Sequence, residues 1–165
     1  MPERATIKRA QRDKRQGKSA STQAGEFVRE EMHHVREGKH GARSTKQAIA
    51  IGLSKARRAG VKLGAPRQGT GSEETRKAAR RESAEGRSHP RRKPSRRRSR
   101  AISRALRREG HSAASHDALA RQARSSAKRR TRAERSAAAR QAARTKGPMK
   151  RRAAARKAAR TRKRR

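Results

Sequence analysis

The chain has 165 residues, of which 52 are Lys or Arg and 13 are Asp or Glu, so its formal net charge is +39. It contains one Phe and no Trp, Tyr or Cys, which excludes disulfides, thiolate chemistry and any zinc site with a Cys ligand. So few large apolar side chains with so high a net charge are typical of chains that are largely disordered alone. We expect an anionic partner to neutralise the charge, most simply the phosphate backbone of a nucleic acid.

Composition divides the chain into four regions. Residues 1–18 are a basic lead-in that we expect to be disordered, and residues 19–66 hold nine large apolar residues. Residues 67–98 are a linker rich in Gly, Ser, Pro and Arg, and residues 99–165 are a cationic tail rich in Ala and Arg. The expected fold class is mostly α with extensive disorder: a small helical hairpin, then long Ala/Arg-rich helices or a disordered basic arm. With no secretory signal and no run of 18 apolar residues, we expect no membrane partner and a cytoplasmic location.

A first helix is predicted to begin near Ser21 or Thr22 and to stop at Gly38. Its apolar residues are spaced by four, four and three and therefore share one face; they are Ala24, Val28, Met32 and Val35. Phe27 widens this stripe.

A second helix follows, opened by Ser44-Thr45-Lys46-Gln47, which fits a capping box. Ile49, Leu53 and Ala56 form its apolar stripe. Gly60 followed by Val61 fits a Schellman ending with an apolar contact after it.

Together the two helices predict a hairpin whose core is Phe27, Val28, Met32, Val35, Ile49, Leu53 and Val61. Nine large side chains bury too little area to order about 40 residues. We therefore expect the hairpin to need a second copy, a nucleic acid or another protein, and a homodimer through the hairpin is one such arrangement.

Beyond the hairpin the chain predicts a short helix capped by Ser72, an extended stretch over residues 88–98, and a helix over residues 99–109 that ends at Gly110. A further helix is expected to start at Ser115 and to break at Gly147-Pro148.

The tail contains a repeat, "AAARQAART" at 137–145 and "AAARKAART" at 153–161. Within each copy two arginines sit four apart, and like charges at that spacing oppose a helix in water. Phosphate oxygens would relieve the repulsion, so the tail is expected to gain helix on binding.

Residues 118–165 carry 20 Lys and Arg against a single acid, a net charge of +19. If helical throughout they would span roughly 72 Å, alongside which duplex DNA carries about 42 phosphates. That ratio is typical of a protein that neutralises and compacts DNA rather than one that reads a short site.

Arg outnumbers Lys by 38 to 14, and Arg binds phosphate bidentately and enters narrow minor grooves. The stretch "PRRKP" lacks the Gly-Arg-Pro core of minor-groove hooks, which favours a plain phosphate-binding linker. Aromatic platforms for base stacking are absent. The predicted nucleic-acid-binding residues are the clustered cations of the linker and tail: Arg91, Arg92, Lys93, Arg96, Arg97, Arg98, Arg129, Arg130, Arg140, Arg144, Arg151, Arg152, Arg156, Lys157, Arg160, Arg162, Lys163, Arg164 and Arg165.

Three histidines, His33, His34 and His40, lie near acids of the first helix. The adjacent pair points about 100° apart on a helix, and no matching ligand cluster follows. We interpret all three as solvated helix residues. The sequence predicts no metal, no cofactor and no catalytic residue, and hence no enzyme.

Residues 27–60 resemble a family of small bacterial proteins of unknown function. That family shares a helix ending Glu-Gly-Lys, a short linker and a helix of the pattern Lys-Gln-Ala-Ile-Ala-Ile-x-Leu-Ser-x-Ala. The matching residues are Glu37, Gly38, Lys39, Lys46, Gln47, Ala48, Ile49, Ala50, Ile51, Leu53, Ser54 and Ala56. Gly52 stands where Ala is more usual, which weakens the helix. The resemblance implies kinship but no mechanism, although relatives are often labelled DNA-binding or plasmid-stabilisation proteins. The tail is similar in composition to bacterial linker-histone-like tails.

The leading hypothesis is a nucleoid-associated, histone-like protein that binds DNA phosphates without sequence preference. A ribosome- or RNA-associated basic protein is the alternative, and a plasmid-maintenance or antitoxin-like factor is a third.

Overall fold

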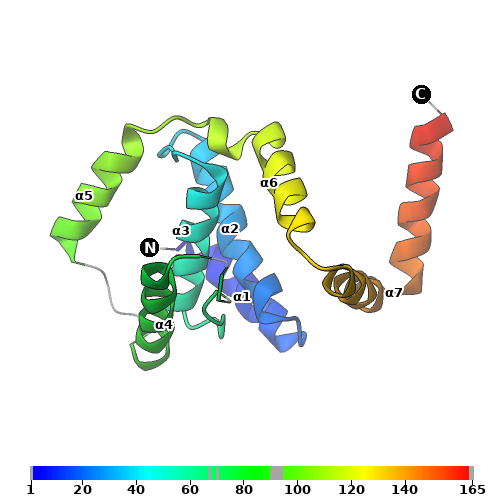
Figure 1. The fold of residues 1–165 in the computed structure, drawn as a ribbon, viewed down its shortest axis with the longest axis horizontal. Coiled ribbons are helices and arrows are strands. Elements are labelled where there is room, and N and C mark those ends of the chain that lie inside the picture. Colours follow the sequence, from blue (N-terminus) through cyan, green and yellow to red (C-terminus); the bar gives the residue numbers. More distant parts are fainter. Residues whose placement is uncertain (1, 67, 70, 90–94, 164–165) are drawn as a thin grey trace. The chain divides into compact units, whose positions relative to one another are not determined.

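The computed structural model describes residues 2–66, 68–69, 71–89 and 95–163. Within these residues the chain forms seven α-helices and one short 3-10 helix, with no strand, which confirms the mostly α class. Residues 1–122 and 123–165 form separate compact units (Figure 1). The elements are α1 (Arg4–Arg15), α2 (Ala20–Arg36), α3 (Thr45–Arg58), α4 (Glu73–Ser88), α5 (Arg96–Arg107), η1 (Ser112–Ala114), α6 (His116–Lys128) and α7 (Arg132–Lys163).

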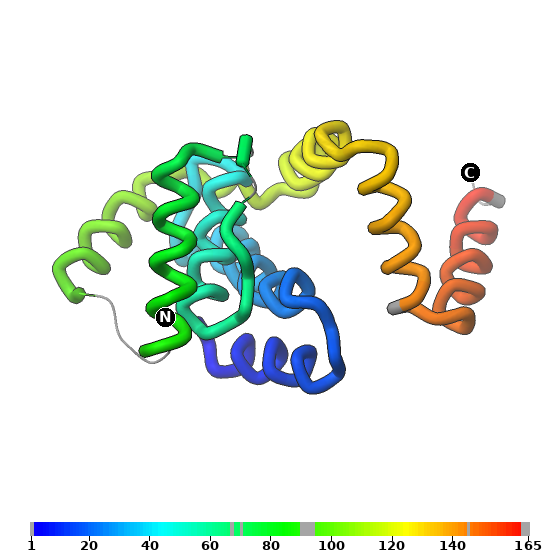
Figure 2. The backbone as a smooth tube through the Cα atoms, turned by 60° about the horizontal axis from the view of Figure 1, so that its bottom comes forward, coloured from blue at the N-terminus to red at the C-terminus, as the bar shows by residue number. Residues whose placement is uncertain are grey.

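The first unit is built around the α2–α3 hairpin. Helix α1 packs against α2, and α4 packs against α3, so the first four helices follow one another as neighbours (Figure 2). None of the helices in the described part of the chain has the length and apolar character needed to cross a bilayer.

Helix α1 differs from expectation, because residues 1–18 were predicted to be a disordered lead-in. Thr6, Ala10 and Asp13 are buried at the i, i+4, i+7 spacing of one helical face. Ile7 and Ala10 pack with Phe27 of α2, and Asp13 pairs with Lys18 at 2.6 Å. This buried face is made mostly of small or paired polar residues, whereas large apolar residues are the usual sign of a buried helical face.

The hairpin helices begin and end at capping residues. Helix α2 begins at Ala20, just before the predicted start near Ser21 or Thr22, and is capped by Ser19, whose Oγ accepts from the Thr22 amide. Ser44 caps α3 by accepting from the Gln47 amide. Gln47 Oε1 in turn accepts from the amide of Arg43, which lies one residue before the predicted box.

Both hairpin helices stop at glycines with positive φ, Gly38 at 72° and Gly60 at 84°. The bonds from Gly60 N to Arg57 O and from Val61 N to Ala56 O form the predicted Schellman ending. Val61 is then carried into the core at 9% exposure.

Gly52 allows the close approach of the two hairpin helices. A Cβ built at Gly52 would lie 2.7 Å from Cα and 2.9 Å from N of Val28. Since the obstacle is backbone, no side-chain rotation relieves it. The helix-weakening glycine noted in the sequence therefore has a packing role, which the expectation of a merely weaker helix missed.

The hairpin core divides into two clusters, and other segments of the same chain cover both. Phe27 and Val61 lie in one with Ala10, while Leu53 is partly buried beside them. Met32 and Val35 lie in the other, where Val28 and Ile49 are partly buried. Ala113 and Ala114 of η1 complete the second cluster. The core therefore includes residues outside 19–66, which the estimate for the hairpin alone did not count.

Hydrogen bonds fix η1 and the end of α5 onto the hairpin. Thr45 Oγ1 donates to Ala113 O at 2.7 Å, and Arg36 Nε donates to Ala114 O at 2.8 Å. The amide of Gly41 donates to Leu106 O, and a Cβ at Gly41 would collide with Glu109 O.

Downstream elements agree in part with the predictions. Ser72 caps α4 through the Thr75 amide, as expected. Helix α5 begins at Arg96 rather than near residue 99, so three arginines predicted to be extended form its first turn. Residues 90–94 of the predicted extended stretch lie outside the described residues. The predicted tail helix is divided between α6 and α7, and α7 is interrupted at Gly147 (φ 65°, ψ 169°), where a break was expected.

Candidate nucleic-acid interface

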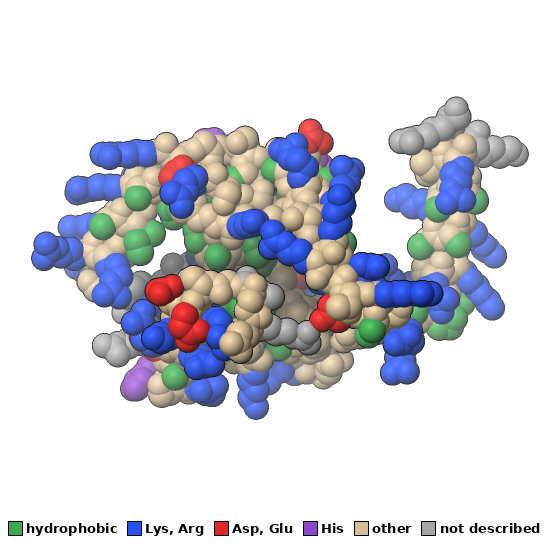
Figure 3. Space-filling view, viewed as in Figure 1, with side chains coloured by type: hydrophobic (Ala, Val, Ile, Leu, Met, Phe, Trp, Pro, Cys, Tyr) green, Lys and Arg blue, Asp and Glu red, His purple; other side chains and the backbone are tan. Residues whose placement is uncertain are grey.

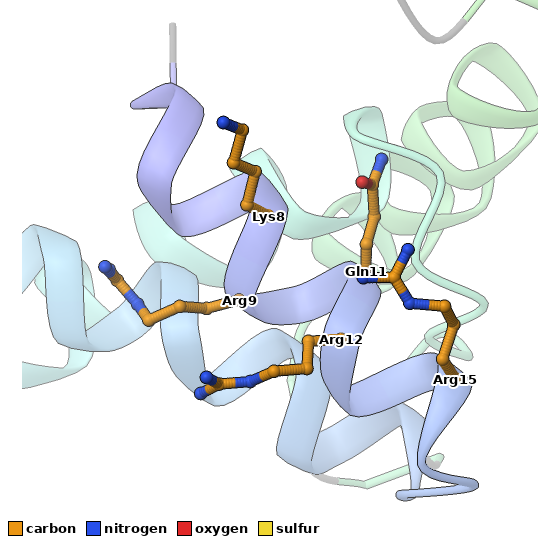
Figure 4. Close-up of a pocket in the computed structure, with 5 residues that line it drawn as sticks. All are labelled: Lys8, Arg9, Gln11, Arg12 and Arg15. Atoms are coloured by element: carbon orange, nitrogen blue, oxygen red, sulfur yellow. The ribbon is translucent and has the colours of Figure 1, made fainter.

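One face of α1 is a cationic surface. A shallow hollow of about 410 Å³ is lined by Lys8, Arg9, Gln11, Arg12 and Arg15 (Figure 4). Lys8, Gln11, Arg12 and Arg15 follow the i, i+3, i+4, i+7 spacing of one helical face and are exposed. No carboxylate of the described residues forms an ion pair with Lys8, Arg12 or Arg15. These three charges are therefore available to an anion.

Arg9 belongs to the same hollow but has a structural role. Its Nε lies 2.6 Å from Glu26 Oε2 on α2, and its Nη2 donates to Thr6 Oγ1 at 2.8 Å. This pairing attaches α1 to α2, which orients the exposed cations of α1 outward.

The acids of the first unit are largely engaged with neighbouring cations. Glu30 and Glu31 face Lys55, and Glu82 lies 3.8 Å from Arg57 while accepting from Ser54 Oγ. These pairs leave the remaining cations of the unit in excess.

Helix α5 carries six arginines and no acid within twelve residues, and none of its residues is buried. Arg96, Arg97 and Arg98 are all exposed. Figure 3 shows Lys and Arg side chains projecting from the visible face of the first unit, while acidic side chains gather mainly over α4.

The second unit has the same character over a longer length. No described side chain of α7 is buried, and Glu134 is the one acid in residues 118–165. Arg140 and Arg144 lie on one side of the break at Gly147, and Arg156 and Arg160 lie on the other. Helix α7 is thus two helical segments rather than one straight helix.

The structure places the predicted nucleic-acid-binding residues as follows. Those on α5, in the turn after α6 and along α7 up to residue 162 are exposed. Five lie outside the described residues: Arg91, Arg92, Lys93, Arg164 and Arg165. Lys163 ends α7, and nothing is described of its side chain. The described residues on α5 form a cationic face of the first unit, and those on α7 form cationic faces of the second.

The cationic face of α1 is not among the predicted nucleic-acid-binding residues. The spacing of Lys8, Arg12 and Arg15 opposite Thr6, Ala10 and Asp13 is the pattern that predicts an amphipathic helix. This amphipathic pattern was overlooked because residues 1–18 were expected to be disordered.

Two histidines also differ from expectation. His33 is exposed, as interpreted, but the side chains of His34 and His40 are only 14% and 16% exposed. Their ring centroids lie 6.1 Å apart, and both approach the buried carboxylate of Glu31. The chain turns at Gly38 and brings His40 back beside α2. This grouping is therefore visible only in the tertiary structure.

Residues 13–68 match the model of a family of unknown function (DUF6496). The match covers α2, α3 and the residues that flank them, and the downstream helices lie outside it. No curated protein matches the chain, and no solved structure matches it. The comparisons therefore connect the hairpin to a family without an assigned activity.

Proposed function

We propose that this protein binds DNA through backbone phosphates, without sequence preference, and acts as a nucleoid-associated, histone-like protein. The observation that carries the proposal is the run of exposed arginines on α5 and α7, where a single acid, Glu134, accompanies them. An exposed guanidinium group can bind two phosphate oxygens at once, and each phosphate that is neutralised releases condensed counterions.

The density of charge fits a phosphate backbone. Helix α5 presents six arginines over about 18 Å, a length along which duplex DNA carries about 11 phosphates. These arginines could neutralise about half of the DNA phosphates that lie alongside α5, and such neutralisation requires no contact with base edges. The absence of Trp and Tyr from the chain further disfavours stacking on unpaired bases.

The arm formed by residues 118–165 supplies the larger contact. Arg140 and Arg144 repel one another at i, i+4 spacing, as do Arg156 and Arg160. We infer that the arm is loosely ordered without DNA and becomes firmly helical when phosphates relieve this repulsion. The break at Gly147 divides it into segments that follow the duplex separately.

The α1 face supplies a second contact, on the other compact unit. A protein with cationic faces on two units contacts two stretches of duplex, which is how a small protein compacts DNA. In this proposal the hairpin orients α1, and dimerisation through the hairpin is not required to complete its core.

Salt-dependent binding tests the proposal. Fluorescence anisotropy would compare the full chain with a variant in which Arg140, Arg144, Arg156 and Arg160 are changed to Gln. The slope of log K against log [salt] should become shallower by up to about 3.6, since each phosphate contact contributes about 0.9. The matched control changes the same four residues to Lys, which keeps the charge and should keep most of the slope.

An unchanged slope in the Gln variant would contradict the role of the arm. Duplexes of unrelated sequence should bind equally within a factor of about two, because phosphate contacts carry no sequence information. Binding that prefers structured RNA over duplex DNA at the same salt would replace DNA by RNA as the partner.

A further inference from the structure

A group of side chains of the types that bind metals lies at the C-terminal half of α2. Glu31 and His34 are three residues apart on α2, and His40 follows the end of that helix. One ligand atom from each of the three residues lies within 4.8 Å of the others.

Glu31 has an oxygen without a hydrogen-bond partner in the described structure. Its side chain is 0% exposed, and Oε2 accepts from Lys55 Nζ at 2.5 Å. Oε1 is buried and accepts no hydrogen bond, although His40 Nε2 lies 3.2 Å from it. A buried carboxylate oxygen left in this way is costly unless a cation faces it.

The hydrogen bond made by the other nitrogen of His40 leaves Nε2 suited to a metal. His40 Nδ1 lies 3.0 Å from Gly41 O, and a carbonyl oxygen only accepts, so Nδ1 carries a proton. In the neutral ring Nε2 then presents a lone pair toward Glu31 Oε1. A backbone carbonyl that fixes a histidine tautomer is the usual support of a metal ligand.

His34 is supported in the same manner. Its Nε2 lies 2.9 Å from Glu3 Oε1. A carboxylate oxygen accepts, so His34 Nε2 donates and Nδ1 keeps the free lone pair. A carboxylate that holds a histidine ring is common behind zinc ligands.

The surroundings favour a cation, in contrast to the rest of this polycationic chain. The connected ion pairs bring together four carboxylates, those of Glu3, Glu30, Glu31 and Glu37, and two ammonium groups, those of Lys39 and Lys55. With both histidines neutral the local net charge is −2.

We propose that Glu31, His34 and His40 bind one divalent transition-metal ion of the Zn²⁺ type. Two imidazole nitrogens and one carboxylate oxygen are a donor set that suits Zn²⁺. Bonds of about 2.1 Å place tetrahedral ligand atoms about 3.4 Å apart, close to the separation of Glu31 Oε1 and His40 Nε2. The ion would join α2 to the segment that leads into α3, which stabilises the hairpin independently of DNA binding.

The test uses the full chain after chelator treatment and dialysis. Isothermal titration with Zn²⁺ should show one ion per chain, and Co²⁺ should give the absorption bands of a tetrahedral site. His34→Ala and His40→Ala should each lose this binding. His33→Ala is the matched control, since His33 is the exposed neighbour of His34, and it should bind as the unaltered chain does. Glu3→Gln should weaken affinity by about 10- to 100-fold, because it alters the support of a ligand.

A second variant separates a metal site from an ion pair with protonated His40. Lys55→Met removes the ammonium from Glu31 and should lower the Tm of the metal-free protein, with Zn²⁺ restoring it. Circular dichroism would establish that each variant is helical before titration. Absence of stoichiometric Zn²⁺ binding, or equal binding after His40→Ala, would overturn the proposal, as would failure of Zn²⁺ to raise the Tm of Lys55→Met.

Discussion

The hairpin region, residues 3–66, and the arm, residues 118–165, are both helical and rich in Ala, but they use charge in opposite ways. In the hairpin region most acids are placed against cations, and Glu31 and Glu30 pair with Lys55 inside the core. In the arm twenty Lys and Arg accompany one acid. Helix propensity alone therefore does not produce a buried core, because α7 has a helical backbone and buries none of its described side chains.

Side-chain size separates the two regions as well. Phe27 and Val35 are 1% and 0% exposed, and glycines such as Gly52 bring helices close enough for small residues to complete the packing. The arm offers Ala and Arg, and Met149 remains 75% exposed. The first region therefore buries large side chains within itself, whereas the described side chains of the arm remain largely exposed.

Truncation of Phe27 should have the largest effect on the stability of the first unit. Phe27→Ala should destabilise the first unit by about 3–5 kcal/mol, because it leaves a cavity among Ala10, Ala24 and Val61. Thermal unfolding followed by circular dichroism measures the loss. Met149→Ala in the arm is the control and should leave the midpoint unchanged; a comparable loss there would mean that the arm also packs.

Gly52→Ala should have the next largest effect, about 1–3 kcal/mol, because the added methyl group meets the Val28 backbone. Denaturant titration measures it. Gly25→Ala on α2 is the matched control, since no atom lies within 4 Å of a Cβ at that position. It should stabilise the helix by roughly 0.5–1 kcal/mol, and equal destabilisation by the two changes would contradict the packing role of Gly52.

Loss of a helix cap should have a smaller effect, again on stability. Ser44→Ala removes the acceptor for the Gln47 amide and should cost about 1 kcal/mol in thermal or denaturant unfolding. Ser95 precedes α5 but makes no side-chain cap bond. Ser95→Ala should therefore leave the unfolding midpoint unchanged. A loss of stability similar to that of Ser44→Ala would contradict the difference in capping between the two serines.

The smallest expected effect concerns Glu74 at the start of α4. Hydrogen bonds to the Glu74 carboxylate, first from its own backbone amide and then from the Ser72 side chain, lower the pKa of Glu74 below its usual value. A carboxyl with a lowered folded-state pKa stabilises the fold above its unfolded pKa, and this contribution is lost as pH falls through the folded value. The first turn of α4 should thus fray only in acid, as measured by carboxyl-carbon NMR. Ser72→Ala should raise the pKa of Glu74, and an unchanged titration would refute this cause.

Much of the fold follows from local sequence patterns. The α2 and α3 stripes, the Ser44 and Ser72 caps, the Gly60 ending and the Gly147 break act within a few residues, so they are readable in one dimension. The cationic candidates of the tail are readable for the same reason, because exposure of an Arg-rich helix without apolar bulk needs no tertiary information.

Other features depend on contacts between distant segments. Helix α1 is held by Phe27 and Glu26 of α2, and η1 by the backbone-directed bonds of Thr45 and Arg36. The approach of His40 to Glu31 depends on the turn at Gly38. Except for His40 and Glu31, these partners are far apart in sequence. Even for His40 and Glu31, the direction that the chain takes after the helix decides whether the two side chains meet.

By itself the sequence determined the helical class, the hairpin and the cationic arm, because periodicity, capping and charge density are local properties of the chain. Only the tertiary structure decided that residues 4–15 belong to the folded unit, that Gly52 is a packing residue and that Glu31, His34 and His40 form one group. These depend on backbone and side-chain atoms that folding brings within a few ångströms of one another, and small or polar residues give little sign in sequence of the neighbours they will have.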